Sequence, residues 1–393
     1  MSTRTIAVIG ATGSIGTSAL DVIAHSQGAL RVGALAVKRS TKELTSLALR
    51  FHPEVVAVAD ETADLTPLES LPSEIEVVVG ARGLEELVRR PTWDVTLLSV
   101  VGSVGLTLAW NVLDVGGTLA LANKEALVSG GAILMDLLRR KGGVLIPVDS
   151  EHSAIYQCLL SRRSTPRSPE ILSADVSRLI LTASGGPFRT WSAEELRHAT
   201  VSDALRHPTW QMGAKVTIDS ASMMNKALEL IEARWLFGLD VDKLSVVIHP
   251  QSIVHSMVEF VDGAVLAQLS PPDMRLPIQF ALYEGRRASS PARKFDWTSA
   301  CQLEFYPPDM TRFPALALGL EAARAGGTSG AVLNAANEVA VAAFQRGKLR
   351  FDQIAHVCRE IVQRHEYQER PTLDTILTLD AWARKETEQW ISQ

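Results

Sequence analysis

Three carboxylates in this chain have the residue type and setting of ligands for a hard divalent cation. Asp149 and Glu151 follow the apolar run VLIPV, where a buried strand gives way to a helix, and Glu229 lies later in a helical segment. Oxygen ligands, with no thiolate and no histidine pair at ligand spacing, favour Mg²⁺ or Mn²⁺, with Co²⁺ as a further alternative, over zinc. The other interpretation of Asp149 and Glu151 is that they cap the helix that begins beside them.

The helix that carries Glu229 is predicted to run from Asp219 to Gly238, with Asp219 or Ser220 as its cap. Its apolar residues fall on one side, and a narrow polar stripe falls on the other: Ser222, Asn225, Lys226 and Glu229. The plain interpretation of that stripe is a solvated face. Two details favour a phosphate instead. Lysine precedes glutamate, which is the weaker order for a surface pair, and donors gather at the first turn, where free N–H groups bind anions.

The N-terminal stretch has the pattern of a dinucleotide-binding turn. An apolar run at 5–9 leads into GATGSIG and then into residues at helical spacing. A βα turn without a ligand is the alternative. After the next predicted strand the chain has Lys38, Arg39 and Ser40, where an NAD enzyme would have an acidic residue. Two cations and a hydroxyl favour the 2′-phosphate of NADP.

Short apolar runs separated by helical segments predict the parallel sheet of a Rossmann-like N-terminal domain over residues 1–149. After the first strand, the runs are 31–37, 55–59, 75–79, 95–100, 118–122 and 144–148. Asn123, Lys124 and Glu125 come directly after one of these strands. They would lie at the carboxyl edge of the sheet, where such folds bind ligands.

The remaining chain predicts a central α+β catalytic domain over 150–284, a linker over 285–310 and a C-terminal helical bundle over 311–393. The linker is aperiodic, and the last segment is rich in alanine without strand signals. Asp262-Gly263 predicts a β-hairpin. The NAANE motif at 334–338 is expected to begin a helix, and we assign it no chemistry.

Two long polar segments interrupt the central domain. Residues 161–170 are expected to form a loop. Residues 184–213 form a long connection that begins with the turn-forming sequence SGGPF. We expect this connection to act as a lid. Trp210 would be the cover of that lid, unless it packs as ordinary core.

Composition bounds the class of protein. The chain has 393 residues, 46% hydrophobic and 21% charged, which indicates a globular protein of two or three domains. A net charge of −5 without a basic block argues against a nucleic-acid partner. Cys158, Cys301 and Cys358 are widely separated and predict reduced thiols. With no leader pattern and no apolar run of membrane-spanning length, we expect a cytoplasmic protein without a membrane partner.

Taken together, several motifs closely resemble the 1-deoxy-D-xylulose 5-phosphate reductoisomerase family. They follow the family's order from about residue 5 to past residue 340: GATGSIG, LANKE, DSEHSAI, TASGGPF, HPTWQMG, SASMMNKALELIEARWLF, HPQSIVHSMVEF and LNAANE. The resemblance implies an enzyme of the non-mevalonate isoprenoid pathway. It implies a sugar phosphate substrate, NADPH, a divalent metal and a homodimer.

The resemblance also implies roles for individual residues. The metal ligands would be Asp149, Glu151 and Glu229. The substrate contacts would be Lys124, Ser150, Glu151, Ser184, His207, Trp210, Ser220, Asn225, Lys226 and Glu229. The cofactor contacts would be Thr12, Gly13, Ser14, Ile15, Lys38, Arg39, Ser40, Asn123, Glu125 and Gly213. Glu151 is our candidate for proton transfer, and Lys124 and Lys226 complete the predicted catalytic set. One departure is that the family commonly has Gly-Lys-Asn where this chain has Lys38-Arg39-Ser40.

The implied reaction is an isomerisation followed by reduction of the resulting aldehyde to 2-C-methyl-D-erythritol 4-phosphate. The rearrangement could proceed by retro-aldol and aldol steps or by a direct shift. One rival is a semialdehyde or homoserine-type dehydrogenase. The semialdehyde type would need a nucleophilic cysteine, and Cys158 lies inside an apolar helical run. Another rival is a non-catalytic NADP-sensing regulator, which would not need the three carboxylates.

Overall fold

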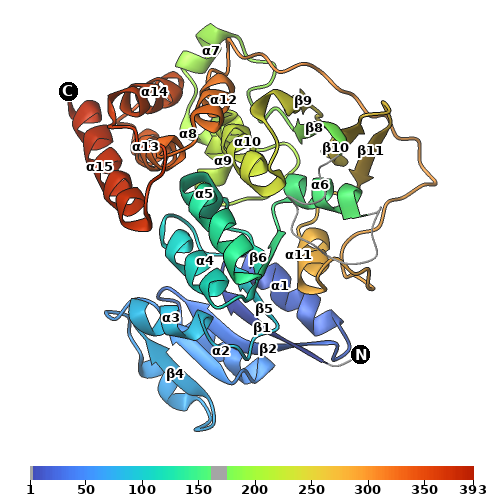
Figure 1. Cartoon of the computed structure of the whole chain (residues 1–393), viewed down its shortest axis with the longest axis vertical. Helices are drawn as coiled ribbons and strands as arrows, with labels where there is room; N and C mark the ends of the chain where they lie inside the picture. Colours follow the sequence, from blue (N-terminus) through green and yellow to red (C-terminus); the bar gives the residue numbers. More distant parts are fainter. Residues whose placement is uncertain (1–2, 161–174) are drawn as a thin grey trace.

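A computed structural model of the chain describes residues 3–160 and 175–393, so the loop expected at 161–170 lies outside the described residues. Two sheets and a group of C-terminal helices make up the fold (Figure 1). Helices α5 (Lys124–Lys141) and α10 (Met224–Phe237) lie between these three parts. Both helices are therefore placed to join one part to another.

The first sheet is parallel, with the order β4-β3-β2-β1-β5-β6-β7. Its strands are β1 (Arg4–Ile9), β2 (Leu30–Val37), β3 (Val55–Val58), β4 (Glu76–Val79), β5 (Val95–Leu98), β6 (Thr118–Leu121) and β7 (Val144–Pro147). Its other helices are α1 (Ser14–His25), α2 (Thr41–Phe51), α3 (Ala81–Val88) and α4 (Val104–Asp114). The strand order reverses between β1 and β5, which is where doubly wound sheets bind ligands. The predicted Rossmann-like sheet is confirmed.

The glycine turn after β1 depends on two of its glycines. Gly10 has a φ of +95°, and a Cβ there would lie 2.6 Å from the Ser99 carbonyl oxygen. A Cβ on Gly16 would lie 2.2 Å from the Gly10 carbonyl oxygen. Side chains at these positions would therefore push α1 away from the sheet.

The second sheet is mixed, with the order β11-β10-β8-β9. Its strands are β8 (Val176–Ala183), β9 (Leu244–Ile248), β10 (Val254–Phe260) and β11 (Val265–Leu269). Only the β8–β9 pair is parallel among these described strands. The hairpin predicted at Asp262-Gly263 joins β10 to β11, with Gly263 at a φ of +85°. Helix α6 (Ser150–Leu160) packs on β10 and β11, and α11 (Arg275–Leu282) packs on α1.

The C-terminal region is helical, as predicted. It contains α12 (Ala315–Ala325), α13 (Ser329–Gln345), α14 (Ile354–Arg364) and α15 (Leu373–Ser392). A short 3₁₀ turn, Phe351–Gln353, lies between α13 and α14, and two others in the described chain span Thr66–Ser70 and Val241–Lys243. Residues 285–310, all of them described, form no helix and only an isolated bridge between Tyr306 and Ile248. The NAANE motif does not begin a helix: it lies in the middle of α13, because that helix already starts at Ser329.

The prediction of one helix from Asp219 to Gly238 is wrong at its start. Helix α9 (Ala214–Ala221) ends and α10 begins three residues later, with Met223 at a φ of +63° between them. The hydroxyl of Ser222 donates to the Asp219 carbonyl oxygen at 3.2 Å and accepts from the Met224 N–H at 3.3 Å. These local bonds compete with continuous helical bonding, which explains the break. Gly238 does end α10, in the left-handed conformation.

The connection at 184–213 is not wholly irregular. It contains two short helices, α7 (Ala193–Arg197) and α8 (Val201–Ala204), each with a capping box at its start. Many of its side chains are exposed.

Among all the described residues, no helix has both the length and the apolar character needed to cross a bilayer.

The glycine turn generates a stability prediction. Gly16→Ala places a methyl group against the backbone at Gly10, and overpacking of this kind costs about 1–3 kcal/mol. The melting temperature of the ligand-free protein should therefore fall by several degrees. Gly213→Ala is the matched control, because no atom lies within 4 Å of its added Cβ. Equal melting temperatures for the two variants would contradict the close approach of α1 to the sheet.

Candidate active site

Three carboxylates from distant parts of the sequence meet at one point. Asp149 directly precedes α6, Glu151 lies in the first turn of α6, and Glu229 lies in α10. One oxygen from each lies within 4.8 Å of the others. Glu229 is almost completely buried, and the other two are partly buried. The structure thus brings together the three residues that were predicted to bind metal.

The start of α6 aims two of these carboxylates. The Asp149 carbonyl oxygen accepts from the Ser153 N–H at 2.8 Å, and its Oδ1 accepts from the Glu151 N–H at 3.2 Å. The Ser150 hydroxyl donates to Glu151 Oε2 at 2.6 Å. Asp149 therefore caps α6 while its second carboxylate oxygen stays directed into the cluster.

Two lysines neutralise most of the negative charge of the cluster. Lys124 Nζ lies 2.6 Å from Asp149 Oδ2 and 3.0 Å from Glu229 Oε1, and it also donates to Asn225 Oδ1. Lys226 Nζ lies 3.2 Å from Glu151 Oε1 and contacts Glu229 Oε2. Only 4% of Lys226 and 1% of Glu229 are exposed. The solvated-face interpretation of this stripe on α10 is therefore wrong.

Burial and charge act against each other in this cluster. Burial opposes the charged form of Lys124, but Asp149 and Glu229 outweigh it and hold the Lys124 pKa well above its ordinary value. Burial also opposes the charged form of Asp149, but Lys124 and His152 keep the Asp149 pKa below its ordinary value. Burial, with the Glu229 charge beside it, raises the pKa of Glu151 to about 7. Glu151 can therefore gain or lose a proton near neutral pH.

The donor set fits a hard divalent cation. All three acidic groups offer carboxylate oxygens within reach of one centre. Two ammonium groups already lie among those oxygens, so the site holds positive charge favourably. Asp149, Glu151 and Glu229 are accordingly the residues that would hold the ion.

A second polar group lies where α9 ends. The ring of His207 lies between two hydroxyls, with Nε2 3.0 Å from Ser184 Oγ and 3.1 Å from Ser220 Oγ. Its Nδ1 accepts from the Trp210 N–H at 2.9 Å. Nε2 therefore carries the proton of the neutral ring, and burial lowers the His207 pKa to about 4. Hydroxyls and a ring N–H at one point can bind the oxygens of a phosphate.

Several residues predicted to bind cofactor lie at the starts of helices. Thr12 to Ile15 form the turn into α1, whose first amides have no side-chain cap. Asn123 caps α5, accepting from the Ala126 N–H at 3.0 Å. Its Nδ2 donates to the Val100 carbonyl oxygen at 3.0 Å and to Glu125 Oε2 at 3.0 Å, which ties the loop after β5 to α5. Gly213 precedes α9.

The three residues that follow β2, all predicted to contact the 2′-phosphate, differ in their exposure and in their partners. Lys38 and Arg39 are exposed, and Ser40 precedes α2. Arg39 Nε lies 2.6 Å from Asp60 Oδ2, and its Nη2 donates to Thr62 Oγ1 at 2.5 Å. Arg39 is therefore held by an acidic residue, whereas Lys38 is exposed directly after β2.

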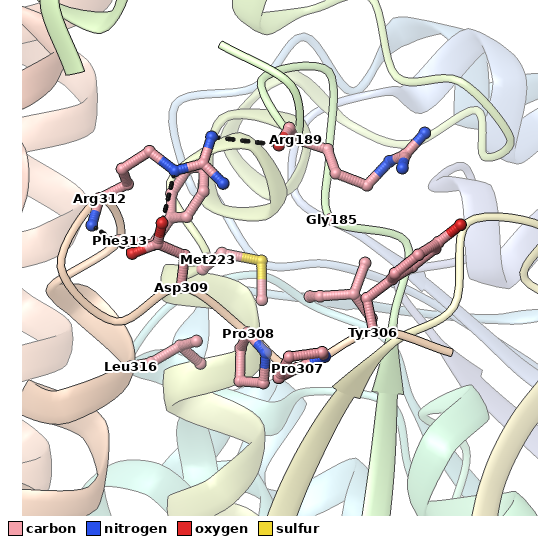
Figure 2. Close-up of a pocket in the computed structure, with 11 residues that line it drawn as sticks. Gly185, Arg189, Met223, Tyr306, Pro307, Pro308, Asp309, Arg312, Phe313 and Leu316 are labelled. Atoms are coloured by element: carbon pink, nitrogen blue, oxygen red, sulfur yellow. Dashed lines mark hydrogen bonds and ion pairs between the residues drawn. The ribbon is translucent and has the colours of Figure 1, made fainter. Parts of the chain in front are cut away.

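A separate cavity of about 220 Å³ lies beside Gly185 (Figure 2). Its lining includes Gly185, Met223, residues 306–309 and residues 312–313, and none of the three clustered carboxylates. Arg312 pairs with Asp309 at 2.7 Å and donates to the carbonyl oxygens of Arg189 at 3.2 Å and Trp191 at 2.6 Å. These bonds fasten the first part of segment 184–213 to the chain before α12.

Comparison with known proteins gives consistent results over nearly the whole chain. Descriptions of 1-deoxy-D-xylulose 5-phosphate reductoisomerase and its C-terminal domains match residues 6–131, 145–237 and 269–386. The reductoisomerase of Heliobacterium modesticaldum is 47% identical, over 97% of this chain and 96% of that protein. That of Rhodopirellula baltica is 44% identical, over 96% and 93%. The chain belongs to the 1-deoxy-D-xylulose 5-phosphate reductoisomerase family.

Solved structures of the family superpose on almost the full chain. The Zymomonas mobilis reductoisomerase in complex with NADPH has a TM-score of 0.90 at 41% identity, covering 99% of both chains. A reductoisomerase in complex with NADPH, fosmidomycin and magnesium has a TM-score of 0.92 at 37% identity, covering 99% of this chain and 98% of that one.

The state of Cys158 also argues against a thiol-dependent dehydrogenase. Burial raises the pKa of the Cys158 thiol to about 11, so the thiol is protonated at neutral pH.

Sequence reasoning missed two residues beside the reductoisomerase carboxylates. His152 Nδ1 lies 3.1 Å from Glu232 Oε2 and 3.5 Å from Asp149 Oδ1, and its Nε2 donates to the Glu229 carbonyl oxygen at 3.0 Å. Both His152 and Glu232 are buried. They clamp α6 to α10 and so set the spacing of the carboxylates. A signal was present, because Glu232 continues the polar stripe one turn beyond Glu229.

His255 generates a pH prediction. Burial lowers its pKa to about 4 from an ordinary value of 6.5, so the folded protein favours the neutral ring. The resulting stability is present above about pH 6.5 and is lost as the pH falls toward 4. Between pH 7.5 and 5 it should amount to roughly 2 kcal/mol. Urea unfolding of wild type and His255→Gln should therefore show a smaller loss on acidification in the variant. Parallel losses in the two proteins would contradict the assignment.

Proposed function

We propose that this protein catalyses the NADPH- and metal-dependent conversion of 1-deoxy-D-xylulose 5-phosphate to 2-C-methyl-D-erythritol 4-phosphate. The observation that carries the proposal is the buried meeting of Asp149, Glu151 and Glu229 with Lys124 and Lys226. Family membership supplies the reaction. The reaction belongs to the non-mevalonate isoprenoid pathway, and Mg²⁺ or Mn²⁺ is the preferred ion, with Co²⁺ as an alternative.

The two bound groups divide the chemistry between them. When bound, the metal ion supplies a Lewis acid for the substrate's adjacent oxygens and NADPH supplies the hydride. Solved relatives hold NADPH or magnesium, which supports both choices. In this chain Thr12, Gly13, Ser14, Ile15, Asn123, Glu125 and Gly213 would contact the cofactor. Lys38, Arg39 and Ser40 would face its 2′-phosphate, with Arg39 leaving Asp60 to do so.

The phosphate end of the substrate would lie against the hydroxyls at the end of α9. Ser184, Ser220 and the Nε2–H of His207 already converge there. Asn225 and Lys226, at the start of α10, would add an amide and a cation. Because this end takes no part in bond making, its binding energy can orient the reacting end.

Glu151 is the residue best suited to move a proton. It lies in the carboxylate cluster on the first turn of α6, where it could accept the proton of a substrate hydroxyl and later return it. Ser150 donates a hydrogen bond to the same carboxylate and would turn toward substrate. Lys124 and Lys226 would stabilise negative charge on the substrate oxygens while the carbon skeleton rearranges.

Segment 184–213 would close over the substrate. Arg312 holds its first part, and the Trp210 N–H bonds to His207, so movement of the segment would reach the phosphate residues. The Trp210 ring is partly buried and lies 5.9 Å from the His255 ring, centre to centre. In this arrangement residues 1–149 bind cofactor, 150–284 bind metal and substrate, 285–310 link the parts, and 311–393 brace them.

We further propose that the protein is a cytoplasmic homodimer. The support for a dimer is a set of exposed apolar side chains on β11, an edge strand of the second sheet. Val265, Leu266 and Leu269 are 49%, 40% and 39% exposed there, and Val261 beside them is 73% exposed. Apolar side chains gathered on a sheet edge mark a surface that another chain covers.

Consumption of NADPH tests the proposed function. Absorbance of NADPH should fall only when 1-deoxy-D-xylulose 5-phosphate and Mg²⁺ or Mn²⁺ are both present. Glu229→Gln removes one charged oxygen ligand at equal volume, so turnover should drop by at least about 10³-fold at limiting metal while NADPH binding persists. Glu388→Gln, at an exposed position, is the control. Full turnover of Glu229→Gln at limiting metal would refute the metal assignment.

The dimer proposal has its own test. Leu266→Glu places a charge on the edge strand β11 without entering the core, because Leu266 is 40% exposed in the single chain. Light scattering should give twice the 42.6 kDa chain mass for wild type and a mass near 42.6 kDa for the variant. Leu205→Glu, at an exposed position directly after α8, should leave the wild-type mass unchanged. A variant mass equal to that of wild type would place the interface elsewhere.

A further inference from the structure

A buried ionic chain lies outside the carboxylate cluster, on α9. Lys215 Nζ lies 2.8 Å from Asp219 Oδ2 and 3.7 Å from Glu125 Oε1. Asp219 Oδ1 accepts from Asn337 Nδ2 at 2.8 Å. Asp219 and Asn337 are essentially fully buried, and Glu125 is nearly so. These contacts therefore join α5, α9 and α13, which come from three separate parts of the sequence.

The position of Lys215 suggests that these ionic contacts do more than stabilise the fold. Lys215 lies two residues after Gly213, at the point where segment 184–213 passes into α9. Its partner Glu125 lies in the first turn of α5 and shares a hydrogen bond with Asn123, which in turn holds the loop after β5. Lys215 thus connects the end of the proposed lid to the turn that would bind the cofactor.

Helix α9 can carry this connection to the phosphate residues. Ser220, in its last turn, lies beside His207. Asp219, one residue earlier, is fastened to Asn337 in the middle of the long helix α13. A shift of Glu125 would act on the first turn of α9 while the last turn stays anchored. The start of α9, and with it the end of segment 184–213, is therefore the part that would respond.

We propose that Lys215 is a positioning residue that couples occupancy of the cofactor site to the placement of segment 184–213. The inference rests on the proposed function, because it takes Glu125 as part of the NADPH site. NADPH bound beside Glu125 holds that carboxylate still, Lys215 follows it, and the lid end becomes ordered over the substrate site. Coupling of this kind is reciprocal, so closure of the segment also strengthens NADPH binding.

The NAANE motif helps to hold α9 in place. Its second asparagine, Asn337, donates to Asp219, and Glu338 pairs with Arg384 of α15 at 2.8 Å. Asn334 donates to Glu338 at 3.0 Å. The C-terminal helices therefore supply the fixed point against which α9 acts, although they come from the end of the chain furthest from the nucleotide turn.

The test compares trypsin cleavage with NADPH binding in one set of variants. Segment 184–213 offers exposed cleavage sites after Arg189, Arg197 and Arg206. Lys215→Met removes the charge and keeps the length of the side chain, and Lys215→Arg keeps the charge. Lys348→Met, at an exposed position, is the matched control. NADPH affinity is measured separately, by its fluorescence, so that every protein can be saturated.

In wild type, saturating NADPH should slow cleavage within the segment by at least about fivefold, the lower end of typical coupling. Lys215→Met should bind NADPH about tenfold more weakly and, once saturated, should lose most of that protection. Lys215→Arg and Lys348→Met should behave as wild type. Equal protection of saturated Lys215→Met and wild type would overturn the inference, as would wild type that binds NADPH without protection.

Two further outcomes are also decisive. Wild type that binds no NADPH would refute the proposed function, and the inference would fall with it, whereas all other failures leave the proposed function intact. If Lys215→Met does not fold, as judged by its circular dichroism, Lys215→Gln takes its place. Glutamine can still donate to Asp219 but cannot pair with Glu125 as a cation, so its protection should again be lost.

Discussion

Five charged side chains share a largely buried volume in this molecule, and their mutual pairing is the interaction on which the site depends. Burying charge costs several kcal/mol per ion unless each ion is paired and hydrogen-bonded. The cluster meets this condition because Lys124 and Lys226 each contact two carboxylates. One carboxylate remains in excess, which is consistent with the raised pKa of Glu151. The three helices that supply the charges must therefore keep their spacing. Close packing of α5 on α10 contributes to this, because a Cβ on Gly131 of α5 would lie 2.2 Å from Trp235 Cδ1 of α10.

The break between α9 and α10 separates two tasks that a single helix would have had to combine. Ser220 and Asn225 are five residues apart, which would place them about 140° from each other around a continuous helix. The left-handed Met223 lets α9 and α10 take different directions. Ser220 then lies beside His207, while Asn225 donates to Glu229. Phosphate binding and the reacting end are thus built from adjacent residues on two helices, and the substrate would extend between them.

Much of this arrangement was predictable from the sequence, and the exceptions have physical causes. The glycine turn, the parallel strands and the Asp262-Gly263 hairpin depend on local patterns, and the structure bears them out. The helix break was missed because Ser222 competes for backbone bonds only through its own side chain, which a hydrophobic period does not register. His152 and Glu232 were missed because their pairing joins residues 80 positions apart in the chain. The cofactor role of Arg39 was predicted from its charge alone. Its ion pair with Asp60 was missed because Asp60 follows the next strand, β3.

The central claim is that Asp149, Glu151 and Glu229 form one metal site, and anomalous scattering from bound Mn²⁺ tests it most directly. Crystals grown or soaked with Mn²⁺ should give a single strong anomalous peak within ligand distance of oxygens from all three carboxylates, roughly 2.0–2.3 Å. Lys124 and Lys226 should turn away from the oxygens that the ion takes. A peak held by other residues, or a fully loaded crystal in which the three carboxylates still bind only the two lysines, would contradict the account.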